Sequence, residues 1–272
     1  MERRARTKNA CSSHFYGGWA ALSGLVRGSH GVVCYTAPVF VPNFPDMRVD
    51  PEGPQVFFGE ELDVGWLMGA YRRGFFPWPD ENEELNWWCP MERMVFTPST
   101  YKPARRLMRS LRQGRWQVSV DTAFQEVVEA CAYDERPGHG EGTWITPQLQ
   151  ELFLDLHRRG LAHSVEVRRE GRLVGGLYGL ALGRMFFGES MFSREPNGSK
   201  VALSVLLAYL RERNFDLLDA QVENPHLLSL GGEFMARSTF LDRLEGSLLQ
   251  ENLLGPWEMA ANFAQEAFPA GS

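Results

Sequence analysis

Three polar side chains in the second half of the chain have the types and spacing needed for chemistry. Glu189 lies inside the apolar stretch MFFGESMF, residues 185–192. Burying an unpaired carboxylate is costly or raises its pKa, so Glu189 needs a partner or a function. Asp219 and Gln221 belong to the predicted strand FDLLDAQV, in which alternate side chains share one face. This carboxylate and amide are either a hydrogen-bonded structural pair or part of a reactive site.

The elements expected to position these groups are strands and helices that follow one another along the chain. Valine and charged residues alternate in residues 163–169, which is typical of a half-buried strand. Strands with intervening helices predict a mixed α/β fold. The predicted strands are 163–169, 173–182, 183–192 and 215–222, and the predicted helices are 62–73, 102–113, 121–131, 147–159, 199–213 and a region around 239–249.

The composition is that of a soluble globular protein with one or two domains: 272 residues, 44% hydrophobic and 23% charged. No run approaches the roughly 18 apolar residues of a membrane-spanning helix. The four cysteines are far apart and form no CxxC pair, which favours reduced thiols in a cytosolic protein over a zinc site or disulfides. A net charge of -6 argues against a uniformly basic nucleic-acid binder, although local basic patches remain compatible with it.

Four segments are expected along the chain. Residues 1–45 are rich in Arg, Ser and Gly and lack periodicity, which predicts a disordered extension. A transit peptide fits this segment, and so does an upstream start site. A smaller N-terminal domain is expected at 46–132, a second domain at 133–250 and a C-terminal tail at 251–272.

A basic helix is predicted within residues 101–115, which contain six cations and no acid. Arg105, Arg109 and Arg112 are spaced to share one helix face, with Arg106 beside it. A solvated charged face is the ordinary interpretation. A phosphate-binding patch for RNA that tolerates many sequences is the alternative.

The motifs FFPW, WWCP, GTWIT, HSVEV, GGLYG, FFGESMFS, SKVAL and LLDAQVENPHLLSLGG occur in this order. In order and separation they resemble the leucyl/phenylalanyl-tRNA–protein transferases from about Leu62 to Leu244. The resemblance implies an enzyme without a cofactor, acting as a monomer. It would move Leu, Phe or Met from aminoacyl-tRNA to the N-terminal Arg or Lys of acceptor proteins and so mark them for degradation. It also implies that residues 133–250 form a catalytic domain folded like a GNAT acyltransferase.

The same resemblance implies roles for individual residues. Gln221 would hold the attacking amine, Asp219 would polarise it or relay its proton, Glu189 would hydrogen-bond an amine, and Asn224 would be a further active-site residue. Trp78 and Trp144 match residues that contact the terminal adenosine of tRNA, and Arg105, Arg106, Arg109 and Arg112 would bind its phosphates. The apolar pocket for the donor side chain maps to Leu177, Phe186, Leu206, Leu218 and Ala220.

Two other functions are compatible with these residues. A GNAT-like acyltransferase that uses acyl-CoA would share the fold class, but SREPNGSK is a poor version of the glycine-rich turn that cradles pyrophosphate. A non-catalytic tRNA-binding module would explain the basic helix and the tryptophans but not the paired Asp219 and Gln221.

Replacing both Arg105 and Arg109 by Glu is expected to weaken the binding of all charged tRNAs about equally and to reduce its salt dependence, because phosphate contacts carry no direct sequence information. Transfer from a minimal aminoacyl-adenosine is expected to survive. Binding of several tRNAs over a range of salt concentrations measures this effect. Unchanged affinity would make the helix an ordinary solvated face.

Overall fold

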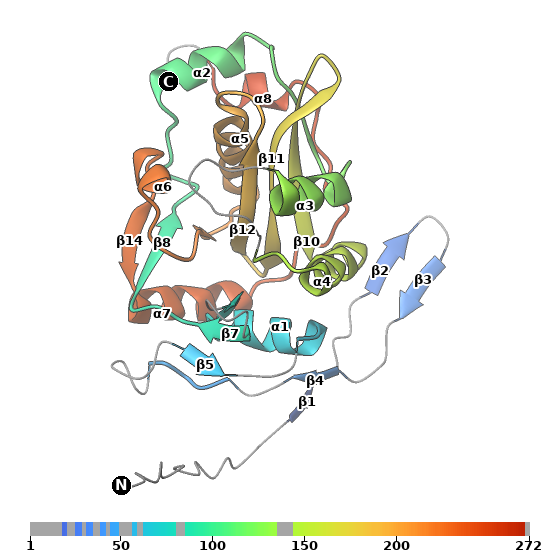
Figure 1. The fold of residues 1–272 in the computed structure, drawn as a ribbon, viewed down its shortest axis with the longest axis vertical. Helices are drawn as coiled ribbons and strands as arrows, with labels where there is room; N and C mark the ends of the chain where they lie inside the picture. Colours follow the sequence, from blue (N-terminus) through green and yellow to red (C-terminus); the bar gives the residue numbers. More distant parts are fainter. Residues whose placement is uncertain are drawn as a thin grey trace, which may run out of the picture.

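The computed structural model (Figure 1) describes residues 44–48, 56–58, 62–79, 85–134 and 144–269, together with four short strands nearer the N-terminus. In these strands β1 pairs with β4, and β2 pairs with β3. The rest of the predicted extension up to residue 43 lies outside the described residues, whereas Phe44 is buried in the core. The four strands are β1 (Gly18–Ala20), β2 (Leu25–Gly28), β3 (Gly31–Cys34) and β4 (Val39–Val41).

A seven-stranded sheet organises most of the described chain. All neighbouring strands are antiparallel except β12 and β13, which are parallel because helix α5 (Gly198–Glu212) carries the chain back between them. Strands β8 and β9 come from the predicted segment 46–132, and the domain division after residue 132 stays a prediction. Across the sheet the order is β14 (Glu233–Ala236), β8 (Glu92–Phe96), β13 (Leu217–Asp219), β12 (Met185–Ser193), β11 (Arg172–Leu182), β10 (Ala162–Arg169) and β9 (Gln117–Val120).

Each face of the sheet packs against its own hydrophobic core. On β12, Phe187 belongs to the first core and its neighbour Phe186 to the second, as the alternation of a strand requires. Helices α3 and α4 lie over one face, and α5 covers the other (Figure 1). The first core includes α1 (Val64–Arg72), α3 (Phe124–Tyr133), α4 (Pro147–Arg158) and α7 (Arg237–Leu248), and the second includes α2 (Arg105–Arg112), α5 and α8 (Phe263–Glu266).

Two smaller pieces complete the architecture. A three-stranded sheet in the order β5, β7, β6 lies near α1 (Figure 1), and the short helix α6 (Pro225–Ser229) connects β13 to β14. Within the described part of the chain, no helix is long and apolar enough to cross a membrane. The strands of the small sheet are β5 (Val56–Phe58), β6 (Phe76–Pro79) and β7 (Leu85–Trp88).

The mixed α/β class predicted from the sequence is confirmed. The predicted strands 163–169, 173–182 and 183–192 correspond to β10, β11 and β12. The predicted strand 215–222 is wrong at its C-terminal end. Strand β13 ends at Asp219, and Gln221 has a φ of 67°, which lies outside the extended region.

The segment predicted as a C-terminal tail packs into the second core. Trp257 is only 4% exposed, and its ring stacks on His163 with 3.6 Å between ring centroids. Its backbone N–H donates to the Asp121 carboxylate at 2.6 Å. The same carboxylate lies 2.8 Å from His163 Nδ1, and burial lowers the pKa of His163, so the neutral ring donates this bond. These contacts join the tail to β10 and to the turn after β9.

Replacing Trp257 by Ala is expected to lower the free energy of unfolding by about 3–5 kcal/mol, as for other large-to-small core substitutions. Denaturant unfolding measures the change. Leu249 is 82% exposed, so Leu249→Ala is the control and should change the free energy by no more than about 0.5 kcal/mol. Equal unfolding midpoints for both variants would show that the docked tail contributes little stability.

Candidate active site

Glu189 lies at an irregularity in strand β12. The pairing of β11 with β12 skips one residue between Gly188 and Ser190, so Glu189 is an extra residue in a bulge. The bulge resets the alternation of side chains, because Phe187 before it and Phe192 after it both pack in the first core. Bulges often redirect a side chain beside a functional site.

The carboxylate of Glu189 is buried and only partly satisfied. Its Oε1 atom accepts hydrogen bonds from the Tyr71 hydroxyl at 2.7 Å and from Gln221 Nε2 at 3.1 Å. Its Oε2 atom is buried and has no hydrogen-bond partner among the described residues. Burial raises the pKa of Glu189 to about 8, although the bond from Tyr71 opposes the increase. The group can therefore accept or hold a proton near neutral pH.

Asp219 is fully buried and forms a two-pronged ion pair with Arg93. Arg93 Nε donates to Asp219 Oδ1 at 2.9 Å, and Nη2 donates to Oδ2 at 2.7 Å. The two side chains are 1% and 0% exposed. The sequence prediction did not include Arg93. A cation beside the apolar residues of RMVF could have indicated it, just as a carboxylate in an apolar stretch indicated Glu189.

Gln221 is linked to Asp219, but not by the alternation that the sequence predicted. Because β13 ends at Asp219, the two side chains do not share a strand face, and that prediction is wrong. Instead the Gln221 backbone N–H donates to Asp219 Oδ1 at 2.8 Å, while its side-chain amide reaches Glu189. The three predicted residues thus form one connected network. Tyr71 is the other member that the sequence did not indicate.

Asn224 lies at the exposed N-cap of α6, three residues after Gln221. Its Oδ1 accepts a hydrogen bond from the His226 backbone N–H at 2.8 Å, which caps the helix. Its role toward a substrate stays a prediction.

Trp78 and Trp144, far apart in the sequence, are brought together by the fold. Their rings stack with 6.3 Å between centroids and an interplanar angle of 30°. Trp78 is 38% exposed, and Trp144 is partly buried against the first core. A half-exposed aromatic pair offers a flat surface to a base, although the assignment to adenosine stays a prediction.

The residues predicted to line the donor pocket lie in or against the second core, and their role as a pocket stays a prediction. Four of these residues are buried in the second core, and Ala220 packs against this core while remaining partly exposed. This apolar cluster joins β11, β12 and β13 to α5. Its buried members are Leu177, Phe186, Leu206 and Leu218.

The predicted basic helix is α2, which packs on the second core through Leu107 and Leu111. Arg105, Arg106 and Arg109 are exposed. Arg112 instead donates to the backbone carbonyls of Phe268 and Pro269 at 2.7 and 2.6 Å. Arg112 therefore also anchors the C-terminal segment, which the sequence did not indicate.

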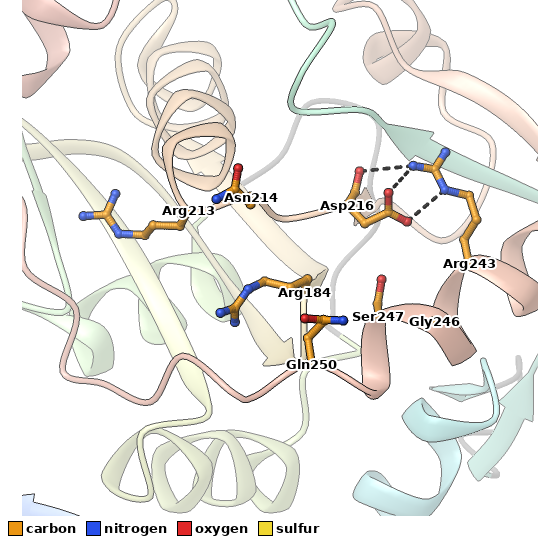
Figure 2. A pocket seen from close by; sticks show the side chains of 8 residues that line it. All are labelled: Arg184, Arg213, Asn214, Asp216, Arg243, Gly246, Ser247 and Gln250. Carbon is orange, nitrogen blue, oxygen red and sulfur yellow. Dashed lines mark hydrogen bonds and ion pairs between the residues drawn. The ribbon is translucent and has the colours of Figure 1, made fainter.

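An arginine-lined hollow of about 490 Å³ lies at the start of β12, near the C-terminal ends of α5 and α7 (Figure 2). Its cations are engaged within the chain. Arg243 pairs with Asp216, Arg184 donates to the Glu251 carbonyl at 2.5 Å, and Arg213 lies over the Tyr209 ring. Arg184 is five residues before Glu189, about 16 Å away along a strand, so the hollow is separate from the Glu189 network.

Comparisons with known proteins match most of the chain. Residues 95–245 match the family model for leucyl/phenylalanyl-tRNA protein transferase, and residues 60–91 match the model for its N-terminal domain. A leucyl/phenylalanyl-tRNA–protein transferase of Xanthomonas euvesicatoria is 48% identical over 80% of this chain and 86% of its own. One of Aromatoleum aromaticum is 49% identical over 73% of this chain and 84% of its own. The L-PGS structure of Bacillus licheniformis aligns with a TM-score of only 0.33 at 13% identity, over 65% of this chain and 56% of that one.

The unusual pKa of Glu189 predicts a specific pH dependence of stability. The folded protein keeps a proton on Glu189 up to about pH 8, whereas the unfolded chain loses it near the ordinary value of 4.5. Stability relative to Glu189→Gln is therefore expected to fall as the pH rises from about 4.5 to about 8. In Tyr71→Phe, which lacks a bond that lowers this pKa, the fall should continue to higher pH. Denaturant unfolding across this range measures both, and a pH-independent difference between wild type and Glu189→Gln would contradict the assignment.

Proposed function

The chain belongs to the leucyl/phenylalanyl-tRNA–protein transferase family and is an aminoacyltransferase acting on proteins, and we propose that Glu189 accepts the proton of the attacking amine. The observation that carries this proposal is a buried carboxylate with a pKa of about 8 and one unpartnered oxygen.

In the proposed reaction the α-amine of the acceptor attacks the ester carbonyl that joins the amino acid to the tRNA ribose. A C–N bond forms and the C–O bond to the ribose breaks. Of the two protons that the α-ammonium nitrogen loses, the first goes to Glu189, which later releases it to water, and the second goes to the ribose oxygen. The base is the carboxylate form of Glu189, which becomes abundant as the pH approaches 8. An α-ammonium group also has a pKa of about 8, so this carboxylate takes its proton at little cost in free energy. A glutamate in water, with a pKa of about 4.3, is too weak a base for this step.

The neighbouring residues position this base and the amine. The Gln221 amide holds the amine beside Glu189, since an amide is a poor base but a good hydrogen-bonding group. Tyr71 donates to Oε1 and leaves Oε2 to the substrate. Asp219, whose two oxygens are already occupied, acts through Gln221 rather than by direct contact. Asn224 contacts substrate from the following loop.

The remaining predicted residues bind the aminoacyl-tRNA donor. The apolar cluster around Phe186 and Ala220 takes the side chain of Leu, Phe or Met, and hydrophobic pockets discriminate by about 1–3 kcal/mol per methylene. The Trp78–Trp144 pair stacks on the terminal adenine, an interaction worth about 1–3 kcal/mol. The exposed arginines of α2 bind phosphates.

We also propose which proteins this enzyme modifies and where it acts. The acceptors carry an N-terminal Arg or Lys, and the added residue marks them for degradation. The enzyme acts as a monomer in the cytosol, without a cofactor. Residues 133–250 form a GNAT-like catalytic domain, for which the parallel β12–β13 pair joined by α5 provides support.

A direct assay separates this function from its alternatives. Purified protein and an Arg-initiated peptide are incubated with leucyl-tRNA or phenylalanyl-tRNA, or with acetyl-CoA, and the peptide mass is measured. Extension by Leu or Phe is expected only with charged tRNA, and Glu189→Gln is expected to lose it. Acetylation would indicate the acyl-CoA enzyme, and tRNA binding without any peptide modification would indicate a binding module.

A further inference from the structure

All three guanidinium nitrogens of Arg93 are bound within the protein. Two of them donate to the carboxylate of Asp219, and Nη1 donates to the backbone carbonyl of Gly74 at 2.9 Å. The guanidinium carbon lies 4.7 Å from the ring centroid of Phe76 and 4.6 Å from that of Phe240. Arg93 is 1% exposed, so water cannot replace these hydrogen bonds. Its position is therefore fixed from several sides.

The bond to Gly74 connects Arg93 to the helix that carries Tyr71. Gly74 follows the end of α1, and its own N–H donates to the Tyr71 carbonyl at 3.1 Å. It has a φ of +79°, and a Cβ there would come within 2.6 Å of Leu241. The chain can thus make this close turn only with glycine. Holding the Gly74 carbonyl keeps the C-terminal turn of α1, and with it the Tyr71 hydroxyl, at a fixed distance from β8.

The bonds to Asp219 connect Arg93 to the second donor. Asp219 Oδ1 accepts both Arg93 Nε and the backbone N–H of Gln221. Gln221 has a φ of 67°, a conformation that is costly for a residue other than glycine and that needs support from its surroundings. The Asp219 oxygen supplies that support and directs the Gln221 side chain toward Glu189.

We propose that Arg93 is a positioning residue that aligns both hydrogen-bond donors of Glu189, Tyr71 through Gly74 and Gln221 through Asp219. Arg93 itself does not touch the substrate. The guanidinium is suited to this role because its planar fork presents donors in fixed directions, whereas a lysine ammonium is a single flexible point charge. The inference rests on the proposed function, since the aligned group is the proposed base.

The direct test is Arg93→Lys, which keeps the charge but loses the fork. The variant is expected to reduce kcat for peptide transfer by about 100-fold, the effect typical of small misplacement of a reacting group, with KM for charged tRNA unchanged. Arg243→Lys is the matched control, because Arg243 makes a similar two-pronged pair with Asp216 outside the site. It should transfer at the wild-type rate. A wild-type rate for Arg93→Lys would overturn the inference.

A second variant keeps the inference testable if Arg93→Lys does not fold. Replacing both members of a buried ion pair by apolar residues often preserves stability, because no buried charge is left unpaired. Arg93→Met combined with Asp219→Leu is therefore expected to fold, with a lower thermal midpoint because the Gly74 carbonyl and the Gln221 N–H lose their partners, and to transfer about 100-fold more slowly. If the folded double variant kept the wild-type rate, the pair would be purely structural and Arg93 would not be a positioning residue.

The pH profile gives a readout that a purely structural role would not change. Asp219 raises the pKa of Glu189 and Arg93 lowers it. In Asp219→Asn the positive charge is left unbalanced, so the midpoint of the remaining activity should move below the wild-type value. Arg93→Lys keeps the charge but weakens the bonds from Tyr71 and Gln221, which lower this pKa, so its midpoint should move above the wild-type value. An unshifted midpoint in Asp219→Asn would contradict the connection. Failure of wild-type protein to transfer at all would instead refute the proposed function, so the two failures are distinguishable.

Discussion

The buried ion pair between Arg93 and Asp219 is the interaction on which the arrangement of the site depends. It joins four parts of the fold: β8, β13, the turn after α1, and α7 through the Phe240 ring. A buried pair is stable only when both partners are also satisfied by further bonds. Here the three guanidinium nitrogens and both carboxylate oxygens are bound. The position of the pair therefore restricts how these elements can move relative to one another.

The elements around the site were largely predictable from sequence, because their signals are local. The alternation of Val165 and Val167 with polar neighbours identified β10, and the glycine-bearing turn marked its hairpin with β11. The expectation that β10 is half-buried was wrong, because Glu166 on its other face is fully buried and accepts hydrogen bonds from three hydroxyl groups. Glu189 was conspicuous as a carboxylate in an apolar stretch, and the structure finds it buried. The roles of the tryptophans and of the apolar cluster came from family resemblance, which residue spacing alone does not provide.

What the sequence did not reveal depends on contacts between distant segments. In the sequence, Tyr71 is an ordinary residue on the apolar face of a short helix. The fold brings its hydroxyl to Glu189, which lies 118 positions later in the chain. Strand β8 was missed because Arg93 to Phe96 are all buried, so no polar alternation marks it. The end of β13 was misjudged because the positive φ of Gln221 is supported by Asp219 and Glu189, and its residue type gives no sign of this.

The order of strands in the sheet also bears on how the site comes into existence. Strands β10, β11 and β12 are consecutive hairpins with short turns, whereas β8 reaches β13 across 126 residues of chain. Contacts between residues near one another in the sequence cost little conformational entropy and form quickly, whereas pairing between distant residues is slow. A chain in which only the β10–β12 meander had formed would contain Glu189 but none of the groups that hold it. We therefore expect catalytic competence to depend on the long-range contacts of β8, because a molecule with the meander alone has a sheet without an active site.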